Sequence, residues 1–326
     1  MSVLVTGAAG FIGFHTSLKL LARGTPVVGV DNMNAYYDPA LKQARLDQLL
    51  KIPGFTFVKA DIADREAMAA LAQAHPEIDS YIHLAAQAGV RHSLTAPFDY
   101  SQANLVGHLT MLEMARANPK LKHFVYASSS SVYGANTKLP FAVEDRVDQP
   151  VSLYAATKRS GELMSHSYAH LYRMPTTGLR FFTVYGPWGR PDMAAYLFCA
   201  AIVAGKPISI FNNGDMRRDF TFIDDIVAGV IGVLDNPPPV VPGVPPARLY
   251  NIGNHRSEQL MDFVGTIETA LGMKAEYKFE PMQLGDVKET YADISAIERD
   301  VGFHPTTPIS VGIPKFVEWY RSYHGV

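Results

Sequence analysis

A tyrosine and a lysine stand four residues apart in a segment that is expected to be helical. Tyr154 and Lys158 form a Y-x-x-x-K pattern within residues 152–172. Positions i and i+4 share one face of a helix, so the two side chains would lie together. A lysine ammonium beside a tyrosine lowers the phenol pKa from its usual value of about 10. The pattern therefore predicts a phenolate that acts as a general base at a hydroxyl group being oxidised.

A run of four serines, residues 128–131, directly follows an apolar segment that is typical of a buried strand. Ligands of parallel α/β sheets bind beyond the carboxyl ends of the strands. A hydroxyl at Ser129, Ser130 or Ser131 would there bridge the substrate hydroxyl and the tyrosine. The alternative is a solvated loop without a role in catalysis. We favour the first interpretation because the run lies at a strand end.

Three glycines follow the first expected strand and open the first expected helix. They are Gly7, Gly10 and Gly13, with Phe11 and Ile12 before the last. In such a loop the first glycine permits a tight turn, the second lets the backbone approach a pyrophosphate, and the third lets the helix pack on the strand. Free N–H groups at the helix N-terminus then face the anion. The alternative is an ordinary tight turn between a strand and a helix.

Acidic residues end the next two expected strands. Asp31 lies 18 residues after Gly13, where a carboxylate accepts hydrogen bonds from both ribose hydroxyls. It would repel a 2′-phosphate, so NAD is favoured over NADP. Asp61 is placed either to contact adenine or to cap the following helix, and the two alternatives stay open. Asn32 and Ile62, which directly follow the two carboxylates, are assigned to the same cofactor site.

The elements that must position these groups alternate along the first half of the chain. Short segments rich in β-branched and aromatic residues, apolar almost throughout, are typical of strands buried on both faces. Longer amphipathic segments separate them, and this alternation predicts the α/β class with a Rossmann-type doubly wound parallel sheet. The expected strands span residues 3–6, 27–31, 55–59, 80–84, 124–128 and 176–181, and the expected helices span 10–23, 39–50, 64–75, 97–117 and 152–172.

The pattern becomes irregular after Thr183. We therefore expect an NAD-binding domain over residues 1–182 and a smaller C-terminal substrate-binding lobe over residues 183–326, with some segments of the latter returning to the first domain. Residues 236–246 read NPPPVVPGVPP, which cannot form a helix or a central strand. They are expected to be an exposed loop of the second lobe.

Composition excludes several classes of protein. Lys plus Arg is 29 and Asp plus Glu is 31, and this near-neutral balance gives no support to a nucleic-acid or anionic-membrane partner. No apolar run reaches the ~18 residues of a membrane span, and the chain opens on a strand rather than a signal peptide. Cys199 is the only cysteine, so no internal disulfide or cysteine zinc cluster is possible, and a cytoplasmic protein is expected. His166 and His170 lack a third ligand, so no metal site is expected.

The glycine trio, Asp31, the serine run and the Tyr154/Lys158 pair together resemble the extended short-chain dehydrogenase/reductases that act on nucleotide sugars. The resemblance extends over the whole chain, and within that group it is closest to the UDP-glucuronate 4-epimerases. The stretches that carry it are residues 34–39 with Lys42 and 44–46, residues 186–193, residues 211–216, and residues 281–283 with Gly285, Asp286 and Val287.

The resemblance implies an NAD-dependent epimerase. Bound NAD+ takes hydride from C4 of the sugar while Tyr154 takes the O4 proton, the 4-keto sugar turns, and hydride returns to the opposite face. It implies that Ser129 is the catalytic serine and that Tyr154 and Lys158 also contact the cofactor. Further residues assigned by the resemblance are Leu84, Ala85 and Ala86 at the nicotinamide ribose, Arg218 at the UDP phosphates, and Asp286 in the substrate site.

Two chemical points favour a plain epimerase acting on a uronate. Ser130 and Ser131 stand where related dehydratases and decarboxylases carry acids, so elimination or decarboxylation lacks its expected acid. Oxidising C4 of a glucuronate makes a β-keto acid, which loses CO2 when its carboxylate aligns with the carbonyl orbital. Thr183 and Arg190 are our candidates to hold that carboxylate. A phosphate or surface contact is the alternative for Arg190, and an ion pair with a neighbouring aspartate is the alternative for Arg218.

The same family resemblance implies a homodimer built from the helices over residues 97–117 and 152–172. These segments carry more apolar residues than one buried face needs, namely Leu105, Leu109, Leu112, Leu163, Met164 and Leu171. Rival functions on this fold are UDP-glucose 4-epimerase and UDP-glucuronate decarboxylase. A different class is a catalytically silent NAD-binding regulatory protein, against which the intact Tyr154, Lys158 and Ser129 argue.

Overall fold

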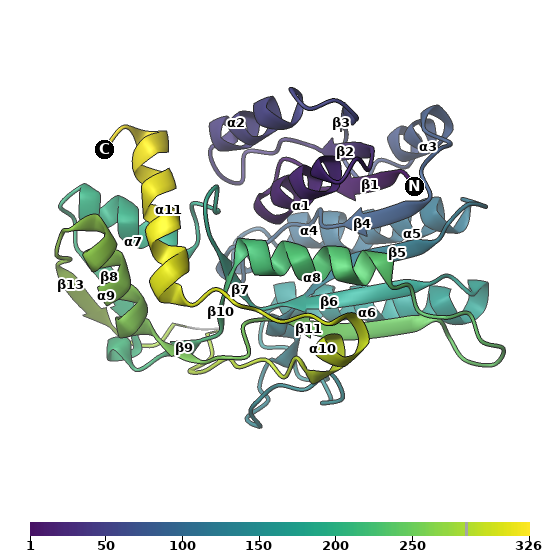
Figure 1. Cartoon of the computed structure of the whole chain (residues 1–326). Coiled ribbons are helices and arrows are strands. Elements are labelled where there is room, and N and C mark those ends of the chain that lie inside the picture. Colours follow the sequence, from purple (N-terminus) through teal and green to yellow (C-terminus); the bar gives the residue numbers. More distant parts are fainter. Residues whose placement is uncertain (284–285) are drawn as a thin grey trace.

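The computed structural model describes residues 1–283 and 286–326, so Gly285 of the last motif lies outside the described residues. The chain forms a large part, in which helices cover both faces of a sheet, and a smaller lobe beside it (Figure 1). The predicted α/β fold with a doubly wound parallel sheet is confirmed. Among the described elements, no helix is long and apolar enough to cross a membrane.

The described sheet has seven strands, all parallel, and the order reverses beside β1 as in dinucleotide-binding folds. Sequence reasoning missed its edge strand β11, because the first half of that strand is only half-buried and lacks a continuous apolar run. In spatial order the strands are β11 (Ala247–Ile252), β6 (Thr176–Phe181), β5 (His123–Ser129), β4 (Ser80–His83), β1 (Val3–Thr6), β2 (Val27–Asp31) and β3 (Phe55–Lys59).

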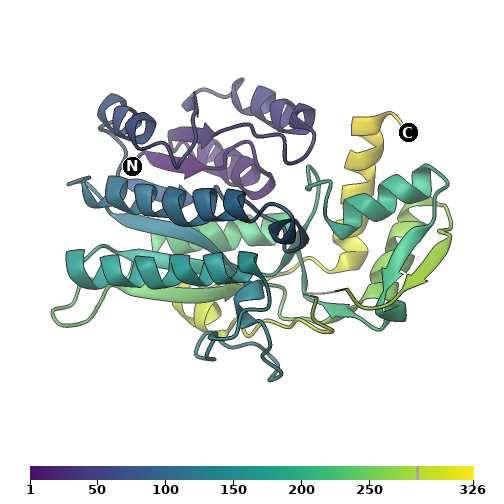
Figure 2. The same ribbon diagram turned by 180° about the vertical axis from the view of Figure 1, so that it is seen from behind.

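Helices cover the sheet on both faces, as Figures 1 and 2 show. The helix predicted over 97–117 is present, but six of its residues form a π-helical turn, η2. Asp38, Asp64 and Ser152 cap α2, α3 and α6 with their side chains, which explains where these helices begin. One face carries α1 (Phe11–Ala22), α2 (Pro39–Leu49) and α8 (Ile223–Asp235); the other carries α3 (Arg65–Ala74), α4 (Pro97–Ser101), η2 (Gln102–Gly107), α5 (His108–Arg116) and α6 (Leu153–Tyr172); α10 (Ser295–Val301) packs beside β11.

The proline-rich loop over residues 236–246 is exposed over most of its length, as expected, but its expected place in the second lobe is wrong. It joins α8 to β11, and both elements belong to the layers of the large part. The chain after residue 183 therefore returns to the large part, where β11 forms the edge of the sheet.

The smaller lobe packs three helices against short strand pairs. Phe220 and Phe263 stack at its centre, with ring centroids 3.9 Å apart. Strand β7 follows β6 after one residue, so the lobe begins directly at the carboxyl edge of the sheet. The elements are α7 (Ala194–Val203), α9 (Leu260–Leu271) and α11 (Ile309–His324), with the strand pairs β7 (Thr183–Tyr185) and β10 (Phe220–Phe222), β8 (Ile208–Phe211) and β13 (Tyr277–Glu280), and β9 (Arg217–Arg218) and β12 (Glu258–Gln259).

A buried ion pair joins α6 to β6 beneath the carboxyl edge of the sheet. Glu162 and Arg180 are each 1% exposed, and two hydrogen bonds of 2.8 and 3.0 Å connect them. Ser128 donates to Glu162 over 2.6 Å, and Arg180 donates to the Tyr133 hydroxyl over 3.1 Å. Burial alone would raise the pKa of Glu162, but the hydrogen bonds and charge of Arg180 bring it below its usual value.

We predict that Arg180→Met lowers the free energy of unfolding by about 3 kcal/mol at pH 7, because a buried carboxylate loses its main partner. The pKa of Glu162 is lowered in the folded protein. The ion pair therefore stabilises the folded state fully at pH values above the unfolded glutamate pKa of ~4.3, and this contribution is lost as the pH falls through the folded-state pKa. The difference between wild type and variant should therefore shrink on acidification. Urea unfolding of wild type and variant, monitored by circular dichroism at several pH values, measures the loss of unfolding free energy and its change with pH. A loss below ~1 kcal/mol would contradict the prediction.

Candidate active site

A cavity of about 970 Å³ lies between the carboxyl edge of the sheet and the smaller lobe. All the residues that the sequence assigned to the site line this cavity. From the cofactor assignment these are Gly7, Gly10, Phe11, Ile12, Gly13, Asp31, Asn32, Asp61, Ile62, Leu84, Ala85 and Ala86, and from the catalytic and substrate assignments they are Ser129, Ser130, Ser131, Tyr154, Lys158, Thr183, Arg190, Arg218 and Asp286.

The glycine loop at the start of α1 requires its glycines. Gly7 has a φ of +72°, a conformation that favours glycine. A Cβ on Gly13 would lie 2.1 Å from the Gly7 carbonyl oxygen, and one on Gly10 would lie 2.9 Å from the same atom. The first turn of α1 holds no acidic side chain and opens onto the cavity. Its geometry and charge therefore fit the pyrophosphate of a dinucleotide.

Backbone groups fix the Asp31 carboxylate in the cavity wall. It accepts hydrogen bonds from the N–H groups of Ala9, over 3.2 Å, and Met33, over 2.8 Å. Lys42 lies 3.8 Å away, and both side chains are 7% exposed. The carboxylate is thus held at the end of β2, where a ribose of the cofactor would lie.

Asp61 does not cap the following helix. The cap of α3 is Asp64, which accepts from the N–H groups two and three residues on, so this alternative for Asp61 is wrong. Asp61 accepts from the Ala63 N–H over 2.9 Å and from the Asn32 side chain over 3.0 Å. The adenine contact stays a prediction.

The predicted catalytic side chains meet where β5 ends beside α6. The Ser129 hydroxyl accepts from the Ser131 N–H over 3.2 Å, which keeps the serine loop turned back on itself. Lys158 donates to the Ala127 carbonyl over 3.0 Å, and its Nζ lies 6.0 Å from the centre of the Tyr154 ring. Burial lowers the pKa of Lys158 to about 8.

Burial opposes the expected lowering of the Tyr154 pKa by Lys158, and that lowering stays a prediction. Burial raises the pKa of Tyr154 above its ordinary value, while a hydrogen bond with Ser129 and the charge of Arg190 oppose the rise. The Lys158 ammonium contacts the Ala127 carbonyl instead of the phenol oxygen.

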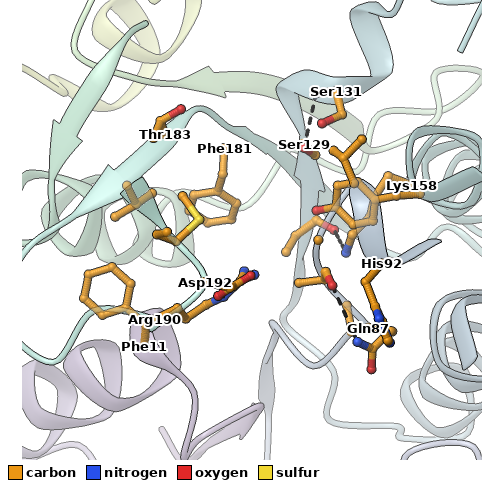
Figure 3. A pocket seen from close by; sticks show the side chains of 18 of the residues that line it. Phe11, Gln87, His92, Ser129, Ser131, Lys158, Phe181, Thr183, Arg190 and Asp192 are labelled. Carbon is orange, nitrogen blue, oxygen red and sulfur yellow. Dashed lines mark hydrogen bonds and ion pairs between the residues drawn. The ribbon is translucent and has the colours of Figure 1, made fainter. Parts of the chain in front are cut away.

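The opposite wall carries Arg190 and Asp192, and Figure 3 shows them facing Ser129 and Lys158 across the cavity. Arg190 donates to Asp192 through Nε, over 3.0 Å, and through one Nη. Asp192 also accepts from the hydroxyl of Tyr36 over 3.0 Å. The surface-contact alternative for Arg190 is wrong, since the side chain faces the cavity.

The cavity wall holds a second group of charged side chains, Arg91, Arg218 and Asp286. Arg218 donates to two backbone carbonyls, those of Arg217 and Lys288, and forms no ion pair with an aspartate of the described chain. The alternative of a neighbouring aspartate as its partner is therefore wrong. Asp286 accepts from Arg91 over 3.1 Å, and the Arg91 guanidinium lies 4.7 Å from the centre of the Phe211 ring.

Over residues 3–253 the chain matches the model of the NAD dependent epimerase/dehydratase family. The chain belongs to this family. It is 49% identical to a probable UDP-glucuronate 4-epimerase of Rhizobium meliloti, over 98% of this chain and 97% of that protein. The structure of UDP-glucuronic acid 4-epimerase from Bacillus cereus in complex with UDP-glucuronic acid and NAD matches with a TM-score of 0.90 at 34% identity, covering 99% of this chain and 100% of that one. A UDP-glucose 4-epimerase from Thermotoga maritima, with UDP-glucose, matches with a TM-score of 0.88 at 27% identity, covering 99% and 100%.

Sequence reasoning assigned no role to several residues that shape the cavity of this family member. Arg45 on α2 donates to the carbonyls of Ala9, over 2.9 Å, and Trp188, over 2.7 Å, and so ties the glycine loop to the loop that carries Arg190. Lys42 lies beside Asp31. Both cations lie on the buried face of α2. Charged residues on an apolar helix face are the signal that would have identified them.

The π-helical turn also has a role that the sequence did not indicate. Asn104 in η2 bonds the backbone of Gln87 on both sides, accepting from its N–H over 2.8 Å and donating to its carbonyl over 3.0 Å. It also donates to Thr157 on α6 over 3.0 Å. The loop after β4 is thus held against the helix that carries Tyr154.

We predict that Asp31→Ala raises the Kd for NAD at least about tenfold, since hydrogen bonds to a charged group contribute ~1.5–3 kcal/mol and each ~1.4 kcal/mol is tenfold. The preference for NAD over NADP should narrow, because a 2′-phosphate no longer meets a carboxylate. Asp47→Ala is the matched control, as it removes an exposed charge from neighbouring α2. Isothermal titration with both nucleotides measures the effect. An unchanged Kd for NAD would remove Asp31 from the ribose site.

Proposed function

We propose that this chain interconverts UDP-glucuronate and UDP-galacturonate at C4, using tightly bound NAD. The similarity over nearly the full chain to a UDP-glucuronate 4-epimerase supports the proposal. The observation that carries it is the position of Arg190, a cation in the cavity wall opposite Ser129 and Lys158. A cation at this place suits a sugar with a carboxylate at C5.

The residues fit a dinucleotide, because the glycine loop leaves no room for side chains and Asp31 is fixed at the end of β2. NAD supplies the acceptor and donor of hydride. Tyr154 then takes the O4 proton and returns it, and Ser129 orients O4 through its hydroxyl. Burial works against the phenolate of Tyr154, so this side chain needs a nearby cation to serve as a base. Lys158, with a pKa of about 8, is the nearby cation that favours the phenolate once the two groups approach.

Arg190 and Thr183 would hold the sugar carboxylate away from the orientation that releases CO2. Both side chains line the cavity, and Arg190 is the charged member. Its guanidinium provides donors in a fixed plane, which defines the plane of a bound carboxylate. Arg218 and Asp286, which also line the cavity, would bind the phosphates and ribose of UDP.

The rival functions fit the cavity less well. UDP-glucose carries a neutral hydroxymethyl group at C5, which gives Arg190 no charge to bind. A decarboxylase needs an acid where this chain has Ser130 and Ser131, and neither is acidic. A silent regulatory protein would not need Tyr154, Lys158 and Ser129 around one cavity.

We predict that Arg190→Ala lowers kcat/KM for UDP-glucuronate by about 10–150-fold, from a charge-assisted hydrogen bond of ~1.5–3 kcal/mol. The low rate expected with UDP-glucose should change little, since it has no carboxylate to lose. Sugar products are resolved by chromatography for both substrates and both proteins. Equal losses on the two sugars would place Arg190 at the UDP or in the scaffold. No conversion of UDP-glucuronate by wild type would overturn the proposed function.

We further propose a homodimer through the outer faces of the helices over residues 97–117 (α4, η2 and α5) and 152–172 (α6). We also propose a cytoplasmic location, which the buried single cysteine favours. In Figure 2 the helical segment α4–η2–α5 and helix α6 run side by side on one face of the sheet. Apolar side chains stand out from them, with Phe98 84%, Leu163 54%, Leu171 66% and Val106 39% exposed. Leu112, expected in the interface, is instead fully buried in the core. Exposed apolar groups in one surface favour association with a second copy.

We predict that the double variant Leu163→Glu/Leu171→Glu is a monomer, because four glutamates would face one another across the two-fold axis. Analytical ultracentrifugation at several concentrations measures the mass. Val311→Glu, at an exposed position on α11, is the control and should leave the mass of the dimer unchanged. A variant that still sediments as wild type would place the interface elsewhere.

A further inference from the structure

We propose that Asp192 and Tyr36 position Arg190, and that this positioning determines whether the 4-keto uronate keeps its carboxylate. The inference rests on the proposed function and concerns how the same site controls its product. Asp192 and Tyr36 would have this effect without contacting the sugar. Both would act through the orientation of one guanidinium group.

The geometry of the pair leaves part of Arg190 available. Asp192 takes the side-on edge of the guanidinium, namely Nε–H and one N–H of an Nη. A guanidinium has five donors, so three remain, and they include the end-on pair between the two Nη atoms. Within the described residues the hydrogen bonds of Arg190 are with Asp192, and the neighbouring Tyr36 hydroxyl is close enough for the guanidinium to act on its pKa. The internal carboxylate therefore fixes the guanidinium plane without occupying the edge that a second carboxylate would use.

Tyr36 fixes the internal carboxylate in turn. Its hydroxyl donates to Asp192 over 3.0 Å, and its ring lies 4.9 Å from that of His92. A Cβ on Gly89 would lie 2.4 Å from the Tyr36 oxygen, so the hydroxyl packs directly on the backbone there. Burial and the charge of Asp192 raise the pKa of Tyr36 to about 12, so it remains a donor throughout the physiological range.

The two residues come from different parts of the fold. Tyr36 lies in the loop between β2 and α2, and Asp192 lies in the loop between β7 and α7. Their hydrogen bond joins the dinucleotide half of the cavity to the loop of Arg190. Arg190 is thus held from the cofactor side, and its charge also favours the ionised form of Tyr154.

This arrangement matters because the 4-keto intermediate is a β-keto acid. If its C5–C6 bond aligns with the carbonyl orbital, that bond breaks and its electron pair forms an enolate at C4 and C5. CO2 leaves, C5 takes a proton, and a UDP-4-keto-pentose remains while the bound NAD stays reduced. A guanidinium that is free to turn would still bind the carboxylate but would no longer hold it out of alignment. Loss of positioning should therefore appear as CO2 release and not as weak binding.

The test counts CO2 released per epimerisation from UDP-glucuronate labelled at C6. Tyr36→Phe removes a neutral hydrogen bond and should raise this ratio about 2–10-fold, and Asp192→Asn should raise it about tenfold or more. KM for UDP-glucuronate should stay within about threefold of wild type. Tyr277→Phe is the matched control, because its hydroxyl donates to Glu268 over 2.7 Å and the residue does not line the cavity, so its ratio should equal that of wild type.

Circular dichroism and thermal unfolding check that each variant folds, and Tyr36→Phe removes only one oxygen atom. Unchanged ratios in both variants, with epimerisation intact in wild type, would overturn the inference while the proposed function stands. Equal losses of kcat on UDP-glucuronate and UDP-glucose without extra CO2 would show a scaffold role and overturn it as well. A wild type that leaves UDP-glucuronate unchanged would overturn the proposed function itself.

Discussion

The buried pair of Glu162 and Arg180 fixes the elements that carry the candidate catalytic groups. Glu162 lies on the helix of Tyr154 and Lys158, and Arg180 lies on the strand that leads to Thr183. Ser128, next to Ser129, donates a further hydrogen bond to the Glu162 carboxylate. A fully desolvated charge pair is costly unless its geometry is satisfied, so the packing of α6, β5 and β6 must hold it in one arrangement. The catalytic geometry follows from that requirement.

Polar contacts across the cavity join the two parts of the molecule. Arg91 contacts Asp286, Tyr36 contacts Asp192, and the Arg45 guanidinium contacts the Trp188 carbonyl in the loop that carries Arg190. Hydrogen bonds are directional, so they fix the width and angle of a cleft more narrowly than apolar contact does. The proposed reaction needs a cleft of fixed width and angle, because the keto sugar must turn inside it while its charged ends stay bound.

The sequence predicted the sheet and the cofactor loop because both depend on local rules. The glycines meet steric demands within seven residues, and buried strands are continuous apolar runs. It missed β11, which is an edge strand reached only after a long proline-rich loop. Helix spacing brings Tyr154 and Lys158 near each other, but it does not indicate that a backbone carbonyl, that of Ala127, accepts from the ammonium. Asp192, the partner of Arg190, accepts a hydrogen bond from Tyr36, which lies 156 residues away in sequence, and no local pattern indicates that contact.

The loop over residues 186–193 is anchored through its backbone. With its pKa lowered by burial to about 4, His15 is neutral and donates to the Pro187 carbonyl over 2.9 Å. Arg45 donates to the Trp188 carbonyl, and Trp188 itself, at a φ of 62°, is held in a strained conformation by packing against Trp319 on α11. None of these anchors uses the side chain of Arg190. The side chains that face the sugar can therefore differ between members of one fold without moving the loop, and the choice of substrate depends on a few residues in a fixed frame.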